Sequence, residues 1–184
     1  MRKLQLPLPI LLLIAALLVA AHPGLAGAQE ADEVLRLHRS GSSAQAVQLA
    51  DKILATRPKD AQMRFLKGVV LAESQRAAQA IEVFQELTQD FPELAEPYNN
   101  LATLHAASGD YDRARVALEQ ALRSNPGYAT ALENLGDVHG MLASRAYARA
   151  MTLDPANLRL PSKLALVREL FIAQRGAAPP AASQ

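Results

Sequence analysis

Residues 95–128 read AEPYNNLATLHAASGDYDRARVALEQALRSNPGY, and the spacing of the alanines and the proline in this block recurs before it. Prolines fall at positions 58, 92 and 126, so consecutive ones lie 34 residues apart. Alanines keep the same spacing at positions 46, 80 and 114. Two further slots keep it with a change of residue: Val34, Gly68, Ala102 and Gly136 in one, Ala50, Phe84 and Leu118 in the other. A period of this length is typical of repeats made of two short helices and two turns.

The residue types in these slots have a physical reason. Small side chains let two antiparallel helices cross closely while larger neighbours interdigitate around them, so each block is expected to need a small residue in each helix. Proline ends the second helix, because it has no N–H and its ring clashes with the preceding turn. Between the helices, residues 40–42 (Ser-Gly-Ser) and Gly109-Asp110 supply turn residues, and Asp110 is expected to cap the next helix.

The chain resembles the tetratricopeptide repeat family. In residues 95–128, Tyr98 fills the slot of a large aromatic, and the next signature slots hold Leu101, Ala102, Ala114, Leu118, Ala121 and Pro126. Residues 61–94 match through Gly68, Ala80, Phe84 and Pro92, and residues 27–60 match more loosely through Leu37, Gly41, Ala46 and Pro58. The resemblance implies an all-α fold, a right-handed superhelical stack of antiparallel helix pairs. We expect about three full repeats, an atypical fourth and a C-terminal capping helix.

The fourth block is shorter than the others. Gly136 to Pro155 spans 19 residues, whereas Ala102 to Pro126 spans 24. Apolar residues nevertheless keep a helical spacing through the block. We therefore expect one long helix over about residues 130–153, with a short hairpin as the alternative. The shortened repeat covers 129–158, and an amphipathic helix over 161–175 is expected to cap the open end of the stack.

The N-terminus is typical of a secretory signal peptide over residues 1–28, with Arg2 and Lys3 before an apolar run and a small-x-small pattern at 26–28. Gln29 is then the expected mature start, and residues 29–175 form a single repeat domain. The alternative is an uncleaved membrane anchor, which the short apolar run disfavours. Residues 176–184 are rich in Gly, Ala, Pro and Ser and are expected to be disordered. The chain has no cysteine, so lipid attachment at cysteine and disulfides are excluded.

Composition and motifs argue against several function classes. Residues 29–184 carry 17 Lys and Arg against 18 Asp and Glu, and no basic stripe indicates nucleic acid binding. No nucleophile elbow or phosphate-binding loop is present in the sequence, so we expect neither an enzyme nor a cofactor nor a small-molecule substrate. His105 and His139 share one slot of successive blocks. We interpret them as packing residues, with a metal site as the less favoured alternative.

The resemblance also implies a binding surface, because in this family the first helix of each repeat lines a concave groove. Eight residues fall in groove-facing slots: Phe65, Val69, Asn99, Asn100, Thr103, Glu133, Asn134 and Asp137. Asparagine amides can both donate to and accept from a peptide backbone, and the acidic pair favours a basic residue of a partner. The alternatives are that the aliphatic members belong to the core and that the polar ones only form a solvated face.

The leading hypothesis is therefore a non-enzymatic scaffold or adaptor, exported to the periplasm of a bacterial cell envelope, that binds a segment of another envelope protein in its groove. Secretion beyond the envelope is a variant of this location. The mature chain is expected to have no transmembrane segment. A second hypothesis is a structural module that forms homo-oligomers through the long fourth-repeat helix and the C-terminal helix.

Overall fold

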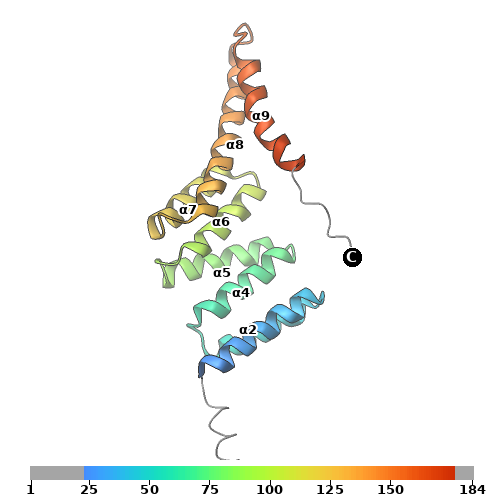
Figure 1. Ribbon diagram of the computed structural model, residues 1–184, viewed down its shortest axis with the longest axis vertical. Helices are drawn as coiled ribbons and strands as arrows, with labels where there is room; N and C mark the ends of the chain where they lie inside the picture. Colours follow the sequence, from blue (N-terminus) through green and yellow to red (C-terminus); the bar gives the residue numbers. More distant parts are fainter. Residues whose placement is uncertain (1–22, 177–184) are drawn as a thin grey trace, which may run out of the picture. The chain divides into compact units, whose positions relative to one another are not determined.

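The structure, a computed structural model, describes residues 23–176, and within them the side chains of residues 27–170. The described part is all-α: eight helices and no strand (Figure 1). The helices are α2 Pro23–Arg39, α3 Ser43–Thr56, α4 Ala61–Glu73, α5 Ala77–Asp90, α6 Ala95–Ala107, α7 Tyr111–Ser124, α8 Ala129–Leu153 and α9 Leu160–Gly176.

The helix boundaries follow the 34-residue period. The first helices of successive blocks begin at Ala61, Ala95 and Ala129. Each second helix ends two residues before one of the periodic prolines, because the ring cannot continue the helix. The predicted cap is confirmed: the carboxylate of Asp110 accepts a hydrogen bond of 3.1 Å from the backbone N–H of Arg113, at the start of α7. Asp60 caps α4 in the same way, through the N–H of Met63.

The turn inside each full repeat has one geometry. After α2, the N–H of Gly41 donates to the carbonyl of His38 and the N–H of Ser42 donates to that of Leu37, the pair of bonds of a Schellman motif. The same two bonds recur 34 and 68 residues later. The central residue takes a positive φ in all three turns: 81° at Gly41, 60° at Gln75 and 78° at Gly109. Two turns therefore use the residue that suits this conformation, and the middle one does not.

The periodic slots form the core. The alanines at 46, 80 and 114 are 0% exposed, and so are Ala50, Phe84 and Leu118. The expectation that every block needs a small residue is wrong at Gly136, because a Cβ built there would meet no atom within 4 Å. The fourth block has no second helix of its own to cross α8 at this point. The close approach that explains the slot elsewhere is therefore missing.

Contacts divide the chain into two compact units, with the division inside α5 between Val83 and Phe84. In the first unit, α2 packs on α3 and α4, and α3 packs on α4. Three side-chain pairs tie these helices together: Glu30 with Arg57, His38 with Glu73, and Asp51 with Lys67. In the second unit, α6 packs on α7, and α8 packs on both α7 and α9.

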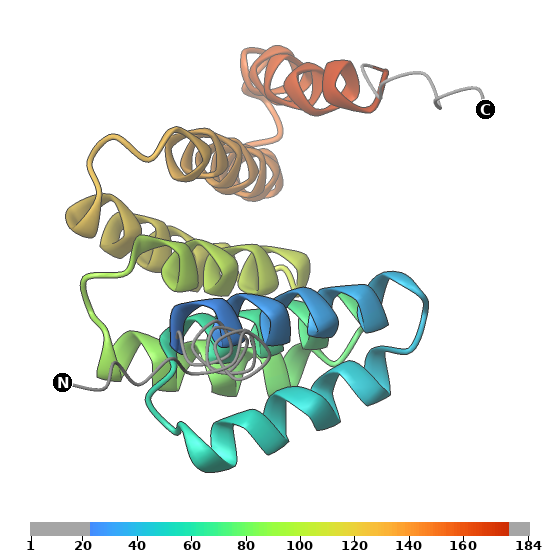
Figure 2. The same cartoon turned by 60° about the horizontal axis from the view of Figure 1, so that its bottom comes forward.

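The long helix of the fourth block is confirmed, since α8 is continuous from Ala129 to Leu153. α9 runs back beside α8 to make a hairpin (Figure 1, Figure 2), with Leu160 and Leu164 buried. Among the described residues no helix has the length and apolar character needed to cross a membrane. α2 begins at Pro23 and continues through the predicted cleavage point at Gln29. The remainder of the predicted signal peptide, residues 1–22, and the tail after Gly176 lie outside the described residues.

Candidate functional site

Six of the eight predicted site residues lie on two helices of the second unit. Asn99, Asn100 and Thr103 are on α6, and Glu133, Asn134 and Asp137 are on α8. α6 and α8 are the first helices of successive blocks, and they touch each other directly. We call this surface the α6/α8 face.

The centre of the α6/α8 face is a hydrogen bond between two asparagines. The side-chain amide of Asn134 donates to the side-chain oxygen of Asn99 over 2.8 Å. Asn99 is 8% exposed, whereas Asn134 is half-buried. A buried amide oxygen without a partner would cost free energy, so this bond satisfies Asn99 and joins α6 to α8. Asn99 therefore helps to join the two helices. That it also contacts a ligand stays a prediction.

Two further polar residues of α6 bond to their own helix. The side-chain amide of Asn100 donates to the carbonyl of Glu96 over 2.9 Å, and the hydroxyl of Thr103 donates to the carbonyl of Asn99 over 3.1 Å. These bonds leave the oxygen of each side chain available as an acceptor. Thr103 is exposed and Asn100 is half-buried, so both can reach a ligand laid along the face.

A cavity of about 150 Å³ opens on the α6/α8 face. Three predicted site residues line it, Thr103, Asn134 and Asp137, which supply a hydroxyl, an amide and a carboxylate. Its remaining wall is apolar, made of Ala102, Ala106, Leu118 and Val138. A water molecule in the liquid takes about 30 Å³, so the cavity has room for one side chain of a ligand. Apolar walls with a few polar groups at the rim are typical of ligand sites.

The charge of the face is negative. Glu133 is exposed and Asp137 is half-buried, one helical turn apart on α8. Every titratable residue predicted for this face is acidic, so a positive group of a ligand would be attracted to it.

The remaining two predicted residues are elsewhere. Phe65 and Val69 are one turn apart on α4, both half-buried, in the first unit. The structure therefore gathers the polar members of the predicted site on one face and keeps the two apolar members in a separate unit. Their part in binding stays a prediction.

None of the four residues that form the apolar wall of the cavity was predicted as a site residue. Ala102, Leu118 and Val138 are buried, and sequence reasoning assigns buried periodic residues to the core. Ala106 was overlooked, although it lies one turn after Ala102 on α6. A run of small residues one turn apart on a first helix is the signal that could have indicated a hollow there.

The two histidines of the shared slot differ in environment. His105 is half-buried on α6, and this burial lowers the pKa of its imidazole, partly offset by the nearby carboxylate of Asp110. His139 is exposed on α8. Among the described residues, no three His, Asp or Glu side chains are grouped closely enough to hold a metal ion.

The sequence pattern of the tetratricopeptide repeat family matches residues 32–95 and 99–154. The chain belongs to this family. The TPR repeat-containing protein YvcD of Bacillus subtilis is 38% identical over 65 residues, which are 35% of this chain and 13% of that protein. The chloroplastic tetratricopeptide repeat domain-containing protein PYG7 of Arabidopsis thaliana is 31% identical over 81 residues, 41% of this chain and 27% of that protein. The aligned parts thus cover only a small share of these relatives.

Among solved structures, the crystal structure of MamA protein superposes with a TM-score of 0.58 at 21% sequence identity. The match covers 79% of this chain and 82% of MamA. Likeness at this level of identity concerns the fold. The all-α repeat architecture predicted from the 34-residue period is confirmed, and a repeat fold of this kind supports a protein–protein interaction scaffold.

Proposed function

We propose that the protein is a non-enzymatic adaptor of a bacterial cell envelope that holds an extended segment of a partner protein on its α6/α8 face. The observation that supports this most is the cavity beside Asn134 and Asp137, because it combines an apolar wall with an acceptor-rich, acidic rim on helices that repeat proteins use for binding. The envelope location rests on the residue pattern of positions 1–28.

The chemistry of the face defines the partner segment. Oxygen atoms of Asn100 and Thr103 are placed to accept from the N–H groups of an extended backbone. The cavity takes one side chain, and Asp137 and Glu133 favour a basic one whose aliphatic stem covers the apolar wall. The segment we propose is therefore extended and carries a Lys or Arg.

Site-specific photo-crosslinking in cells tests the proposal. A photoreactive benzoylphenylalanine at exposed Thr103 should capture a partner, and the same group at exposed Gln85 on α5 should not. Replacing Glu133→Lys together with Asp137→Lys should abolish capture from position 103. The matched control is Glu86→Lys with Glu93→Lys, two exposed acids of the same unit outside this face.

The proposal fails if positions 85 and 103 capture the same proteins with equal yield, or if the two charge-reversed pairs behave alike. A captured partner also allows a direct check. A synthetic peptide covering the crosslinked segment should bind the purified protein, and replacing its basic residue by Gln should weaken binding by at least about tenfold.

A further inference from the structure

The outer part of the α8/α9 hairpin has a charge opposite to that of the repeats before it. Residues 27–140 carry 16 acidic and 11 basic side chains. Residues 141–170, which we call the arm, carry two acidic and five basic ones. The acidic side chains are Asp154, at the end of α8, and Glu169 on α9. The arm is therefore a cationic projection from an otherwise acidic chain.

The arm's five cations have no acidic partner among the described residues. Arg145, nearest the repeats, donates to the carbonyl of Gly109 over 2.8 Å and lies 5.0 Å from the ring centre of Tyr111. Lys163 lies over the ring of Tyr147, at 5.6 Å. Arg149, Arg159 and Arg168 are exposed, and within the described part of the chain no arm cation forms an ion pair. Unpaired cations gathered on one projection indicate an anionic partner.

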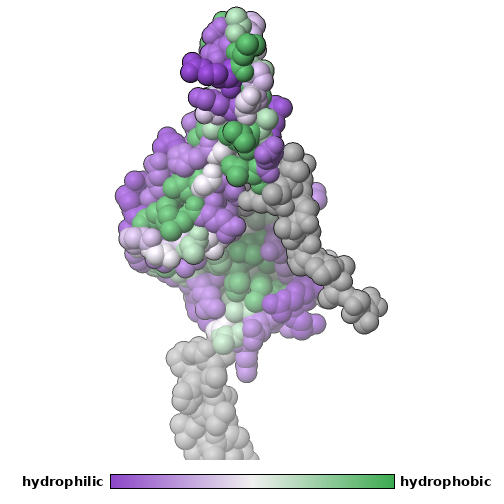
Figure 3. Space-filling view, turned by 45° about the horizontal axis from the view of Figure 1, so that its top comes forward, coloured by the Kyte–Doolittle hydropathy of each residue, from purple (hydrophilic) through white to green (hydrophobic). Residues whose placement is uncertain are grey.

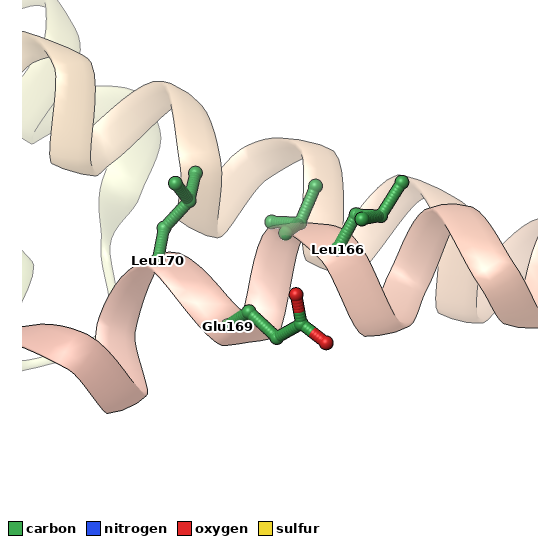
Figure 4. A pocket seen from close by; sticks show the side chains of 4 residues that line it. Leu166, Glu169 and Leu170 are labelled. Atoms are coloured by element: carbon green, nitrogen blue, oxygen red, sulfur yellow. The ribbon is translucent and has the colours of Figure 1, made fainter.

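The arm also exposes leucines. Leu153 and Leu158 flank the turn between α8 and α9 and are 76% and 86% exposed. Leu166 and Leu170, one turn apart on α9, are 64% and 62% exposed. Figure 4 shows these two on one side of α9, with Glu169 beside them at the edge of the same hollow. Only two other large apolar side chains of the described region are exposed, Val116 and Leu132.

The shape of this surface distinguishes between occupants. The leucines at the turn are highly exposed, whereas Leu166, Val167, Glu169 and Leu170 line an open hollow of about 510 Å³ along α9. The space-filling view shows hydrophobic and hydrophilic residues side by side at this end (Figure 3). A folded partner must match such a surface in shape, whereas the interface of a lipid bilayer adapts to it. Exposed leucines together with Arg and Lys in one helical segment are typical of segments that lie at such an interface.

We propose that the arm docks the protein onto an anionic lipid surface. Leu153, Leu158, Leu166 and Leu170 enter the boundary between headgroups and acyl chains. Arg149, Arg159 and Lys163 reach the phosphates, with their aliphatic stems lying along the same boundary. The arm then rests on the membrane without crossing it, and the α6/α8 face, on the repeat side of the chain, is left to a protein partner. This proposal is independent of the function proposed for that face.

Vesicle co-sedimentation tests the proposal with protein purified after expression of the full chain. We expect binding to vesicles of equal parts phosphatidylcholine and phosphatidylglycerol, and little binding to phosphatidylcholine alone. Replacing Arg149, Arg159 and Lys163 by Gln should weaken binding roughly fivefold per cation, about a hundredfold in all. Replacing Leu153 and Leu158 by Ser should weaken it by about tenfold or more. Raising NaCl to about 0.5 M should release most of the wild-type protein.

Matched controls keep net charge and hydropathy equal. Arg39, Lys52 and Lys59 are exposed in the first unit, and replacing them by Gln removes the same charge. Val116→Ser with Leu132→Ser removes the other exposed apolar side chains. Both controls should bind as the wild type does, and far-UV circular dichroism should show all variants equally helical. Any binding through residues 1–28 is common to all variants.

Equal binding by arm and control variants would overturn the proposal. So would arm variants that lose self-association in light scattering while vesicle binding persists, because the occupant would then be a second copy of this chain.

Discussion

The side-chain amide of Asn134 donates a 2.8 Å hydrogen bond to the side-chain oxygen of Asn99, and this bond joins α6 to α8 across two successive blocks. Asn99 is nearly closed to solvent, so the bond is its means of satisfying a buried oxygen. Substituting Asn99 would act on the packing of the repeats, whereas the exposed Thr103 and Glu133 can be changed to test binding.

Replacing Asn134 by Ala should destabilise the protein by about 1–2 kcal/mol, because the oxygen of Asn99 would be left buried without its donor. Asn100→Ala is the matched control. It removes a bond to the carbonyl of Glu96 on the same helix, and should cost less than about 0.5 kcal/mol. Thermal and urea unfolding followed by circular dichroism measure both. Equal losses in the free energy of unfolding would mean that the bond between α6 and α8 stabilises the protein no more than a bond within one helix.

The positive φ of 60° at Gln75 predicts a stabilising substitution. Gln75→Gly should stabilise the protein by about 0.5–1 kcal/mol, since glycine takes this conformation without a steric penalty. Gly109→Ala, at the corresponding turn with φ of 78°, should destabilise it by about 1 kcal/mol. No atom lies within 4 Å of a Cβ built at Gly109, so its cost is conformational only. The changes in unfolding midpoint must have opposite signs, and a shared sign would refute the account of these turns.

Gly136 offers a second stabilising change, for a different reason. It lies inside α8, where glycine is disfavoured relative to alanine, and nothing packs where its side chain would be. Gly136→Ala should therefore stabilise the protein by about 0.5–1 kcal/mol in urea unfolding. A loss of stability would show that a helix crosses α8 closely at this position. The same substitution serves as a check that the fourth block lacks a second helix.

Much of the fold was accessible from the sequence because the period is strict. The 34-residue spacing placed the helix starts, the proline stops and the buried slots, and the missing turn signals predicted one long α8. Asp110 was predictable as a cap because an acidic residue directly precedes a helix after glycine. The positive φ at Gln75 is not indicated by glutamine itself, and it follows only from the 34-residue period, which places Gln75 in the slot of Gly41 and Gly109.

The site was harder to predict than the fold. Asn99 and Asn100 are adjacent and chemically identical, and a helical period alone does not tell which of two neighbours points to the next repeat. The structure buries Asn99 and leaves Asn100 nearer solvent. The bond from Asn134 spans 35 residues, one more than the repeat, and therefore does not follow from slot matching. The exposed leucines of the arm do not follow from the sequence, because α9 was expected to cover apolar surface and the exposure of its leucines depends on tertiary packing.

The histidine on α6 predicts a dependence of stability on pH. Partial burial holds the pKa of His105 below its ordinary value of 6.5, so the folded protein favours the neutral imidazole. Well above pH 6.5 the imidazole is neutral in both the folded and the unfolded protein, so protonation of His105 takes nothing from the stability there. As the pH falls below 6.5, the unfolded chain takes up a proton that the folded chain resists, and stability is lost.

His105→Gln should therefore show a smaller fall in melting temperature between about pH 7.5 and about pH 5.5 than the wild type. His139→Gln, at an exposed position, is the control and should behave as the wild type. An unchanged fall in the His105 variant would contradict this account.

The register of α7 can be tested by overpacking it. Ala114 is 0% exposed where α7 packs on its neighbours, so Ala114→Leu should cost about 1–3 kcal/mol by forcing side chains or backbone aside. Glu119 lies on the same helix and forms a 2.6 Å ion pair with Arg115 at partly exposed positions. Such surface pairs contribute little, and Glu119→Gln should cost less than about 0.5 kcal/mol. Both substitutions fall on one helix and keep its propensity similar, so a difference of more than about 0.5 kcal/mol between their unfolding free energies reports packing. Equal effects would mean that the face of α7 turned to the core has been assigned wrongly, and the cavity wall at Leu118, one turn after Ala114, would be misplaced with it.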